Sequence, residues 1–194
     1  GAGAVLVEGH TSVYMSDVTF NNNVADNISS SGMTGMAGGA VISNGDLVIE
    51  NGSFDSNRAR DSGPGISHGG ALVAASPYGQ SVTINKSIFT NNSAEDGGAI
   101  SQTNNAHLVV ANSIFMNNSA TGATTGSGGA IMNRGGTQFL VNNTIVYNSA
   151  VSSGKGVMAI SGSTTFATSN IIYNNDGEDL AASGGTLNVE ASIF

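Results

Sequence analysis

The chain has 194 residues, of which 9% are charged and 6% aromatic, and 13 acidic against five basic side chains give a formal net charge of -8. Such an excess of acid argues against nucleic acid or an anionic membrane as a partner. No apolar run approaches the roughly 20 residues of a membrane-spanning helix, so we expect no membrane span in this segment. Disordered chains combine low hydrophobicity with high charge, so we assign the 28 glycines to ordered turns.

Two short phrases alternate along the chain. One is a glycine pair followed by alanine and then by isoleucine, valine or leucine, and the other is phenylalanine with asparagine three positions later. In chain order they occupy residues 20–23, 38–41, 54–57, 69–72, 89–92, 97–100, 115–118 and 128–131. Self-similarity with a period of about 20 to 50 residues indicates a solenoid, in which no single repeat buries its own apolar face.

Both phrases predict corners of the solenoid. The glycine pairs suit tight corners where a Cβ atom would collide or φ must be positive. They are Gly38, Gly39, Gly69, Gly70, Gly97, Gly98, Gly128 and Gly129. We expect the asparagines to form a ladder, each amide bonding to its equivalents one coil above and below, and the alternative is a turn residue that merely tolerates the left-handed conformation. These are Asn23, Asn57, Asn92 and Asn118.

Each coil also carries an apolar triplet, with one residue between the first two members and the third member five positions after the second. In chain order the triplets are Val13/Met15/Phe20, Leu47/Ile49/Phe54, Val82/Ile84/Phe89, Leu108/Val110/Phe115, Phe139/Val141/Val146 and Leu187/Val189/Phe194. Strand side chains alternate between faces, so a step of five keeps a residue inward only if the backbone turns a corner. Residues 85–87 and 111–113 suit such a corner.

All members of these triplets are therefore expected to point inward. The core positions that close the triplets are Phe20, Phe54, Phe89, Phe115 and Val146. In the coil that follows, Phe166, Thr168 and Tyr173 keep the same spacing, although a register one residue earlier also fits.

The predicted fold is all-β, a right-handed parallel β-helix of about six to seven coils with three short strands per coil. The handedness follows the general preference of parallel connections. We treat residues 1–194 as a single β-helix segment, and we expect it to be a fragment of a longer solenoid because both ends fall inside a repeat.

The stretch between the second phrase and the next glycine pair varies most in length, from 93–96 at its shortest to 24–37 and 58–68. Stacking in register places these insertions along one edge of the rod, and loops on a rigid scaffold often bind partners. Arg58, Arg60, Asp61 and His68 share one insertion and form the densest mixed-charge group. We assign them as candidate binding residues, and the preferred alternative is a solvated loop with a local ion pair.

The sequence contains no grouping that predicts catalysis. Glu95 and Asp96 are adjacent, but side chains of neighbouring residues usually diverge, and His10 and His107 stand alone as expected surface turn residues. We therefore assign no catalytic residue.

One acidic cluster has a composition typical of a calcium site. It contains Asp176, Glu178 and Asp179, with Gly177 supplying flexibility. A solvated turn is the preferred alternative, so we expect no cofactor, with calcium as the exception to test.

The alternating phrases Gly-Gly-Ala-[Ile/Val/Leu] and Phe-x-x-Asn resemble the repeats of the polymorphic membrane proteins best known from chlamydiae, and similar repeats of other bacterial surface β-helix proteins. The resemblance covers nearly the whole chain; it is clean in 38–131 and loose after Val146. Chlamydial members often contain cysteine and this chain has none. The resemblance implies an extracellular, cell-surface or secreted protein, commonly an autotransporter passenger, that adheres to host cells, and it carries over no catalytic residue.

We therefore predict a non-enzymatic surface scaffold that binds a host-cell protein or glycan through the loops along one edge. Two alternatives stay open. A carbohydrate-active enzyme, either a pectate-lyase-like lyase or a glycoside hydrolase, is suggested by the fold class and the 58–68 loop. A self-assembling filament or sheath subunit is suggested by unpaired strand edges at both ends, which could associate end to end.

Overall fold

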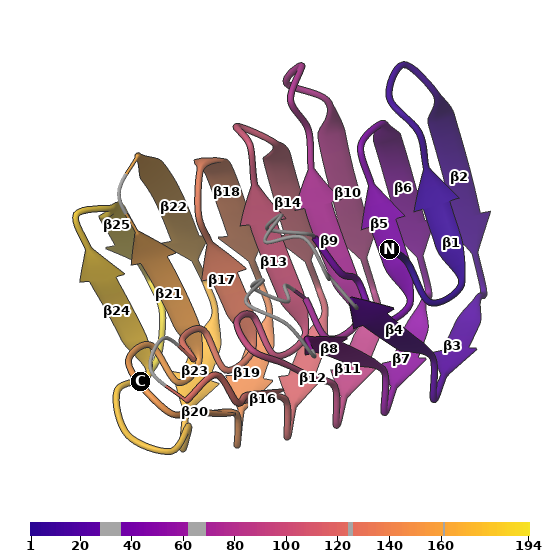
Figure 1. Cartoon of the computed structure of the whole chain (residues 1–194). Coiled ribbons are helices and arrows are strands. Elements are labelled where there is room, and N and C mark those ends of the chain that lie inside the picture. Colours follow the sequence, from indigo (N-terminus) through magenta and orange to yellow (C-terminus); the bar gives the residue numbers. More distant parts are fainter. Residues whose placement is uncertain (28–35, 62–68, 124–125, 161) are drawn as a thin grey trace.

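The computed structural model describes residues 1–27, 36–61, 69–123, 126–160 and 162–194, which wind into a β-solenoid (Figure 1). Every strand-to-strand pairing between successive coils is parallel, as in Val82–Asn85 against Leu108–Ala111. In Figure 1 the chain rises on the near face, crosses over and descends on the far face while it advances toward the C-terminus. This winding is right-handed, so the predicted right-handed parallel β-helix is confirmed.

The two largest sheets each contain one strand from every coil. The first sheet consists of β1 (Val5–Val7), β5 (Val41–Ser43), β9 (Leu72–Ala75), β13 (Ile100–Thr103), β17 (Ile131–Asn133), β21 (Val157–Ile160) and β24 (Leu180–Ser183). The second sheet consists of β2 (Ser12–Ser16), β6 (Asp46–Glu50), β10 (Ser81–Asn85), β14 (His107–Ala111), β18 (Gly136–Val141), β22 (Ser163–Thr168) and β25 (Thr186–Glu190).

Two further sheets close the cross-section. The third sheet consists of β3 (Thr19–Asn21), β7 (Ser53–Asp55), β11 (Ile88–Thr90), β15 (Ile114–Met116), β19 (Thr144–Val146) and β23 (Ile171–Tyr173). The fourth sheet consists of β4 (Val24–Asn27), β8 (Arg58–Asp61), β12 (Ser93–Ala94), β16 (Ser119–Ala120) and β20 (Ser149–Ala150).

The expectation of three strands per coil is therefore wrong, because complete coils have four. Among the described residues, five coils carry strands of all four sheets and the last two are incomplete, so six to seven coils is a slight overcount. The fourth sheet was missed because several of its strands have two residues and its inward side chains are small. These inward residues are Ala25, Ala59, Ala94, Ala120 and Ala150, all of them buried.

The interior is filled by columns of equivalent side chains, as predicted for the first four coils. Phe20, Phe54, Phe89 and Phe115 stack one above another, with ring centroids 5.0, 4.5 and 4.8 Å apart. The last three rings have no measurable exposure to solvent. Stacked rings of this kind bury a large apolar area in each coil and hold the coils in register.

The register predicted for the fifth coil is wrong by one residue. Ile145, rather than Val146, pairs with Phe115 and continues the inward column, while Val146 is buried beside Met116 outside that column. Leu140 likewise replaces Val141, and the ring of Phe139 is 40% exposed. The spacing of apolar residues predicted the wrong register because the inward residue two positions before Leu140 is a glutamine, Gln138.

That glutamine, Gln138, belongs to a polar cluster inside the rod. Its Nε2 donates to the Oε1 of Gln102 at 3.3 Å, and its own Oε1 accepts from Thr165 Oγ1 at 3.3 Å. Asn133 Nδ2 donates to the same threonine hydroxyl at 3.0 Å. Because buried polar groups are tolerated when they are hydrogen-bonded, a partnered glutamine can occupy a core position that an apolar pattern would assign to Phe139.

The asparagine ladder is present. Asn23 Nδ2 donates to Asn57 Oδ1 at 2.8 Å, and the bonds from Asn57 to Asn92 and from Asn92 to Asn118 are each 2.9 Å long. It continues through Asn148 and Asn175. The left-handed conformation occurs one position earlier, at residues such as Ser56 and Asn91, whose φ values are 56° and 55°.

The glycine corners behave as predicted. Gly97 has a φ of 58°, which favours glycine, whereas Gly98 is required for space because a Cβ atom there would overlap the carbonyl oxygen of Gly129 one coil away. The backbones of neighbouring coils therefore meet directly at this edge, and Gly98 N–H donates to Gly128 O at 3.0 Å.

Candidate functional site

The edge that carries the insertions lies between the fourth sheet and the glycine corners. The ends of successive insertions align there, since Gly69 N–H donates to Asp96 O at 3.1 Å and Gly97 N–H donates to Ser127 O at 3.0 Å. Insertions of different length therefore leave and rejoin the rod at one place. This is the geometry expected of a rigid scaffold that presents variable loops on one side.

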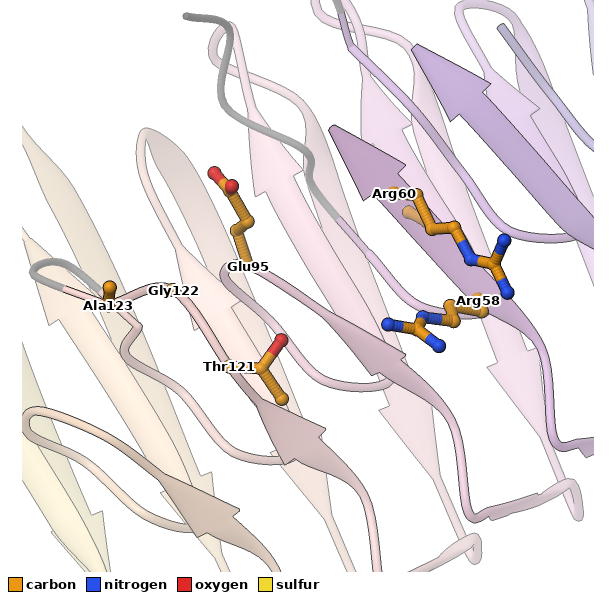
Figure 2. A pocket seen from close by; sticks show the side chains of 7 residues that line it. Arg58, Arg60, Glu95, Thr121, Gly122 and Ala123 are labelled. Carbon is orange, nitrogen blue, oxygen red and sulfur yellow. The ribbon is translucent and has the colours of Figure 1, made fainter. Parts of the chain in front are cut away.

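A hollow of about 320 Å³ opens at this edge (Figure 2). It is formed by segments of three successive coils. Its lining residues are Arg58, Ala59, Arg60, Glu95, Thr121, Gly122 and Ala123. The two predicted arginines therefore lie together at the hollow, and they represent two of the five basic side chains in the chain.

Strand register explains which side chains share this face. Arg58 pairs with Val24 on one side and with Ser93 on the other, and Ser93 pairs with Ser119. Arg60, two residues after Arg58, pairs with Asp26 of the preceding coil. In the following coil, Glu95 stands two residues after Ser93. Arg60 therefore lies between two coils that carry acidic residues at the matching position, whereas the neighbours of Arg58 are uncharged.

The side chains of the two arginines point in different directions. Figure 2 shows the Arg58 guanidinium projecting toward Thr121, while that of Arg60 turns away from Thr121 and Glu95. Within the described residues, neither guanidinium makes an ion pair or a hydrogen bond. Both side chains are exposed, so the hollow offers a positive group at Arg58 that the described protein atoms do not neutralise.

The opposite wall of the hollow is built from small residues that pack closely on the coil before them. Thr121 Oγ1 donates to Ala94 O at 3.0 Å, and Gly122 N–H donates to Glu95 O at 3.0 Å. A Cβ atom at Gly122 would stand only 2.9 Å from that same Glu95 oxygen. The wall is therefore fixed by backbone contacts and leaves space in front of it.

The sequence expectation that Glu95 and Asp96 diverge agrees with their positions. Glu95 lines the hollow, whereas Asp96 has no exposed surface and forms an ion pair with Arg134 of the next coil. Ser127 N–H also donates to Asp96 Oδ1 at 3.2 Å. Burial raises the pKa of the Asp96 carboxyl above 3.8, and the nearby Arg134 charge opposes that rise without cancelling it.

We expect replacement of Arg134 by glutamine to destabilise the rod in a pH-dependent way. With a raised folded-state pKa, stability contributed by Asp96 is present below about pH 3.8 and is lost as pH rises through the folded-state value. Removing Arg134 leaves the ionised carboxylate buried without its partner, so the loss near pH 7 should reach about 1 to 3 kcal/mol. Thermal melting of both proteins between pH 4 and 7 measures this, and a difference that does not grow with pH would contradict it.

The remaining predicted site residues have different outcomes. Asp61 is the last residue of β8, and His68 lies outside the described residues. The calcium assignment of Asp176, Glu178 and Asp179 stays a prediction; among the described residues, no group of three or more histidine, cysteine, aspartate or glutamate side chains is arranged so that it could hold a metal ion. Asp179 accepts hydrogen bonds from Asn175 N–H at 3.1 Å and Asn175 Nδ2 at 2.6 Å, which ends the asparagine ladder.

The two isolated histidines lie on the surface or near it. His10 stacks on Tyr78 with ring centroids 4.9 Å apart, and His107 is exposed at the start of β14. In the part of the chain that the structure describes, no helix is long and apolar enough to cross a membrane.

Comparison with known families gives one match. A family model for the Chlamydia polymorphic membrane protein repeat matches residues 86–103 and 112–134. Each matched segment contains one phenylalanine-to-asparagine phrase and the glycine pair that follows it, so both cross the insertion edge. No curated protein and no solved structure matches the chain.

Proposed function

We propose that this chain, of which residues 86–103 and 112–134 match the Chlamydia polymorphic membrane protein repeat, is a non-enzymatic adhesin of the cell surface. The family and the solenoid fold fit a surface β-helix scaffold. A fold alone does not define a function, so the proposal depends on a site. The observation that supports it is the hollow at the insertion edge, with Arg58 and Arg60 in its wall.

The composition of the hollow favours binding over cleavage. Among the described residues that line it, Glu95 is the only carboxylate, whereas glycoside hydrolysis requires two carboxyl groups about 5 to 9.5 Å apart. We therefore expect acidic and neutral polysaccharides to remain intact in its presence, with or without calcium. Cleavage that Arg60→Ala abolishes without loss of folding would instead support an enzyme.

Binding of the purified chain to host cells and to an array of glycans tests the proposal. We expect saturable binding that falls at least fivefold when Arg58 and Arg60 are both changed to glutamine. Lys86→Gln is the matched control because it removes an exposed positive charge at a different corner of the rod. Absence of binding to every cell type and glycan, by a chain that circular dichroism shows to be folded, would overturn the proposal.

A further inference from the structure

The outer face of the fourth sheet presents hydroxyl groups in register beside Arg58. Ser93, Ser119 and Ser149 occupy equivalent positions in successive coils, about 4.8 Å apart, and each is half-buried. Ser149 Oγ donates to Ser119 Oγ at 3.0 Å, which leaves the Ser119 hydroxyl hydrogen available to a ligand. Thr121 adds a hydroxyl that already donates to Ala94 O, so its oxygen is available as an acceptor.

Arg58 is the cation best placed to bind an anion here. The residues paired with it in the adjacent coils are Val24 and Ser93, both uncharged, and no described residue forms an ion pair with it. Arg60 differs because Asp26 pairs with it. A guanidinium can bind the two oxygens of a carboxylate or a sulfate at once, which gives both strength and orientation.

The charge of the whole chain limits the size of this anion. With 13 acidic and five basic side chains, the protein repels a long polyanion, and one arginine cannot neutralise many negative groups. A ligand that carries one anionic group and otherwise neutral hydroxyl groups fits both the negative net charge of the chain and the row of serine hydroxyls.

We propose that the hollow binds a saccharide with one anionic group, a carboxylate or a sulfate. Within the hollow, Arg58 pairs with the anion and Thr121 accepts from a sugar hydroxyl. Ser119, which is beside the hollow two residues before Thr121, donates to a sugar oxygen that extends out of it. Gly122 and Ala123 have no larger side chain to fill the space that the sugar ring needs. This inference rests on the proposed adhesin function and names the class of its ligand.

Titration of the folded chain with single sugars tests it, with binding followed by calorimetry or by saturation-transfer NMR. The probes are N-acetylneuraminic acid, glucuronic acid and galactose 6-sulfate, with galactose and glucose as neutral comparisons. We expect at least one acidic sugar to bind at least tenfold more tightly than the neutral ones. The carboxylate and sulfate probes distinguish the two sources of negative charge.

The variants identify the residue responsible. Arg58→Gln should weaken binding of the acidic sugar at least tenfold, Ser119→Ala about threefold, and Arg60→Gln less than threefold, while Lys86→Gln should leave it unchanged. Melting temperatures confirm that each variant is folded. Equal affinity for acidic and neutral sugars, or an unchanged affinity in Arg58→Gln, would overturn the inference.

The same measurements separate this inference from the proposed function. A chain that adheres to cells but binds none of the acidic sugars leaves adhesion in place and overturns the saccharide assignment. A chain that binds an acidic sugar through Arg58 but adheres to no cell supports the saccharide assignment and counts against adhesion.

Discussion

Replacing Phe89 with alanine should lower the free energy of unfolding by about 3 to 5 kcal/mol. The ring has no solvent exposure and lies between the rings of Phe54 and Phe115, at centroid distances of 4.5 and 4.8 Å and nearly parallel to both. Truncation removes both stacking contacts and leaves a cavity in the middle of the rod, where neighbouring coils are fixed by their strand pairs. Chemical denaturation of wild type and variant measures the difference.

Two variants of the same strand serve as controls. Phe89→Leu should cost less than about 1.5 kcal/mol, because the same column accepts an aliphatic residue at Ile145. Ile88→Ala should cost less than about 1 kcal/mol, because that side chain points outward and is 45% exposed. Similar losses for Phe89→Ala and Ile88→Ala would show that the inward and outward faces of β11 are assigned wrongly.

Thr90 is a less suitable control, although it also points outward. Its Oγ1 donates to Asp55 Oδ1 at 2.6 Å, and Asn91 Nδ2 donates to the same oxygen at 2.8 Å. These two hydrogen bonds lower the pKa of the Asp55 carboxyl, so Thr90→Ala changes a polar contact between coils as well as a surface side chain.

The sequence was sufficient for the architecture where apolar and turn signals agree. In the first four coils, large inward residues such as Phe54 and Phe89 recur with the asparagine and glycine phrases, so the columns and the ladder could be predicted together. The fourth sheet could not be predicted in this way, because its inward positions hold alanine, whose small side chain contributes little to a pattern of hydrophobic residues.

The shifted register of the fifth coil shows a second limit. Gln138 occupies an inward position because Gln102 and Thr165 supply its hydrogen bonds, and these partners lie 36 and 27 residues away in the sequence. No local pattern shows that they will meet. A pattern of apolar residues then assigns the neighbour of the buried polar residue, here Phe139, to the core although its side chain points outward.

The candidate site was predictable only in part. Arg58 and Arg60 stood out because basic residues are rare in this chain. Thr121 and the row of serines could not be recognised from the sequence, since their position beside Arg58 depends on the pairing of β8, β12 and β16. The buried pair of Asp96 with Arg134 joins residues 38 positions apart, and it too required the stacking order of the coils.

Replacing Asn92 with alanine should destabilise the rod by about 3 to 6 kcal/mol. Asn92 Oδ1 accepts from both the backbone N–H and the Nδ2 of Asn57, each at 2.9 Å. Its Nδ2 donates to Phe54 O at 3.0 Å and to Asn118 Oδ1 at 2.9 Å. The variant leaves several of these groups buried without a partner, and each such group costs about 1 to 3 kcal/mol.

The neighbouring asparagine provides the matched comparison. Asn91 is exposed with a φ of 55°, so Asn91→Gly keeps a permitted backbone and removes only the surface bond to Asp55, which should cost less than about 1 kcal/mol. Denaturation of both variants under the same conditions compares the two positions. If Asn92→Ala lost no more stability than Asn91→Gly, the ladder would contribute nothing net, and the asparagines would serve only to shape the turn. A loss several times larger would show that the amides hold successive coils together at this corner.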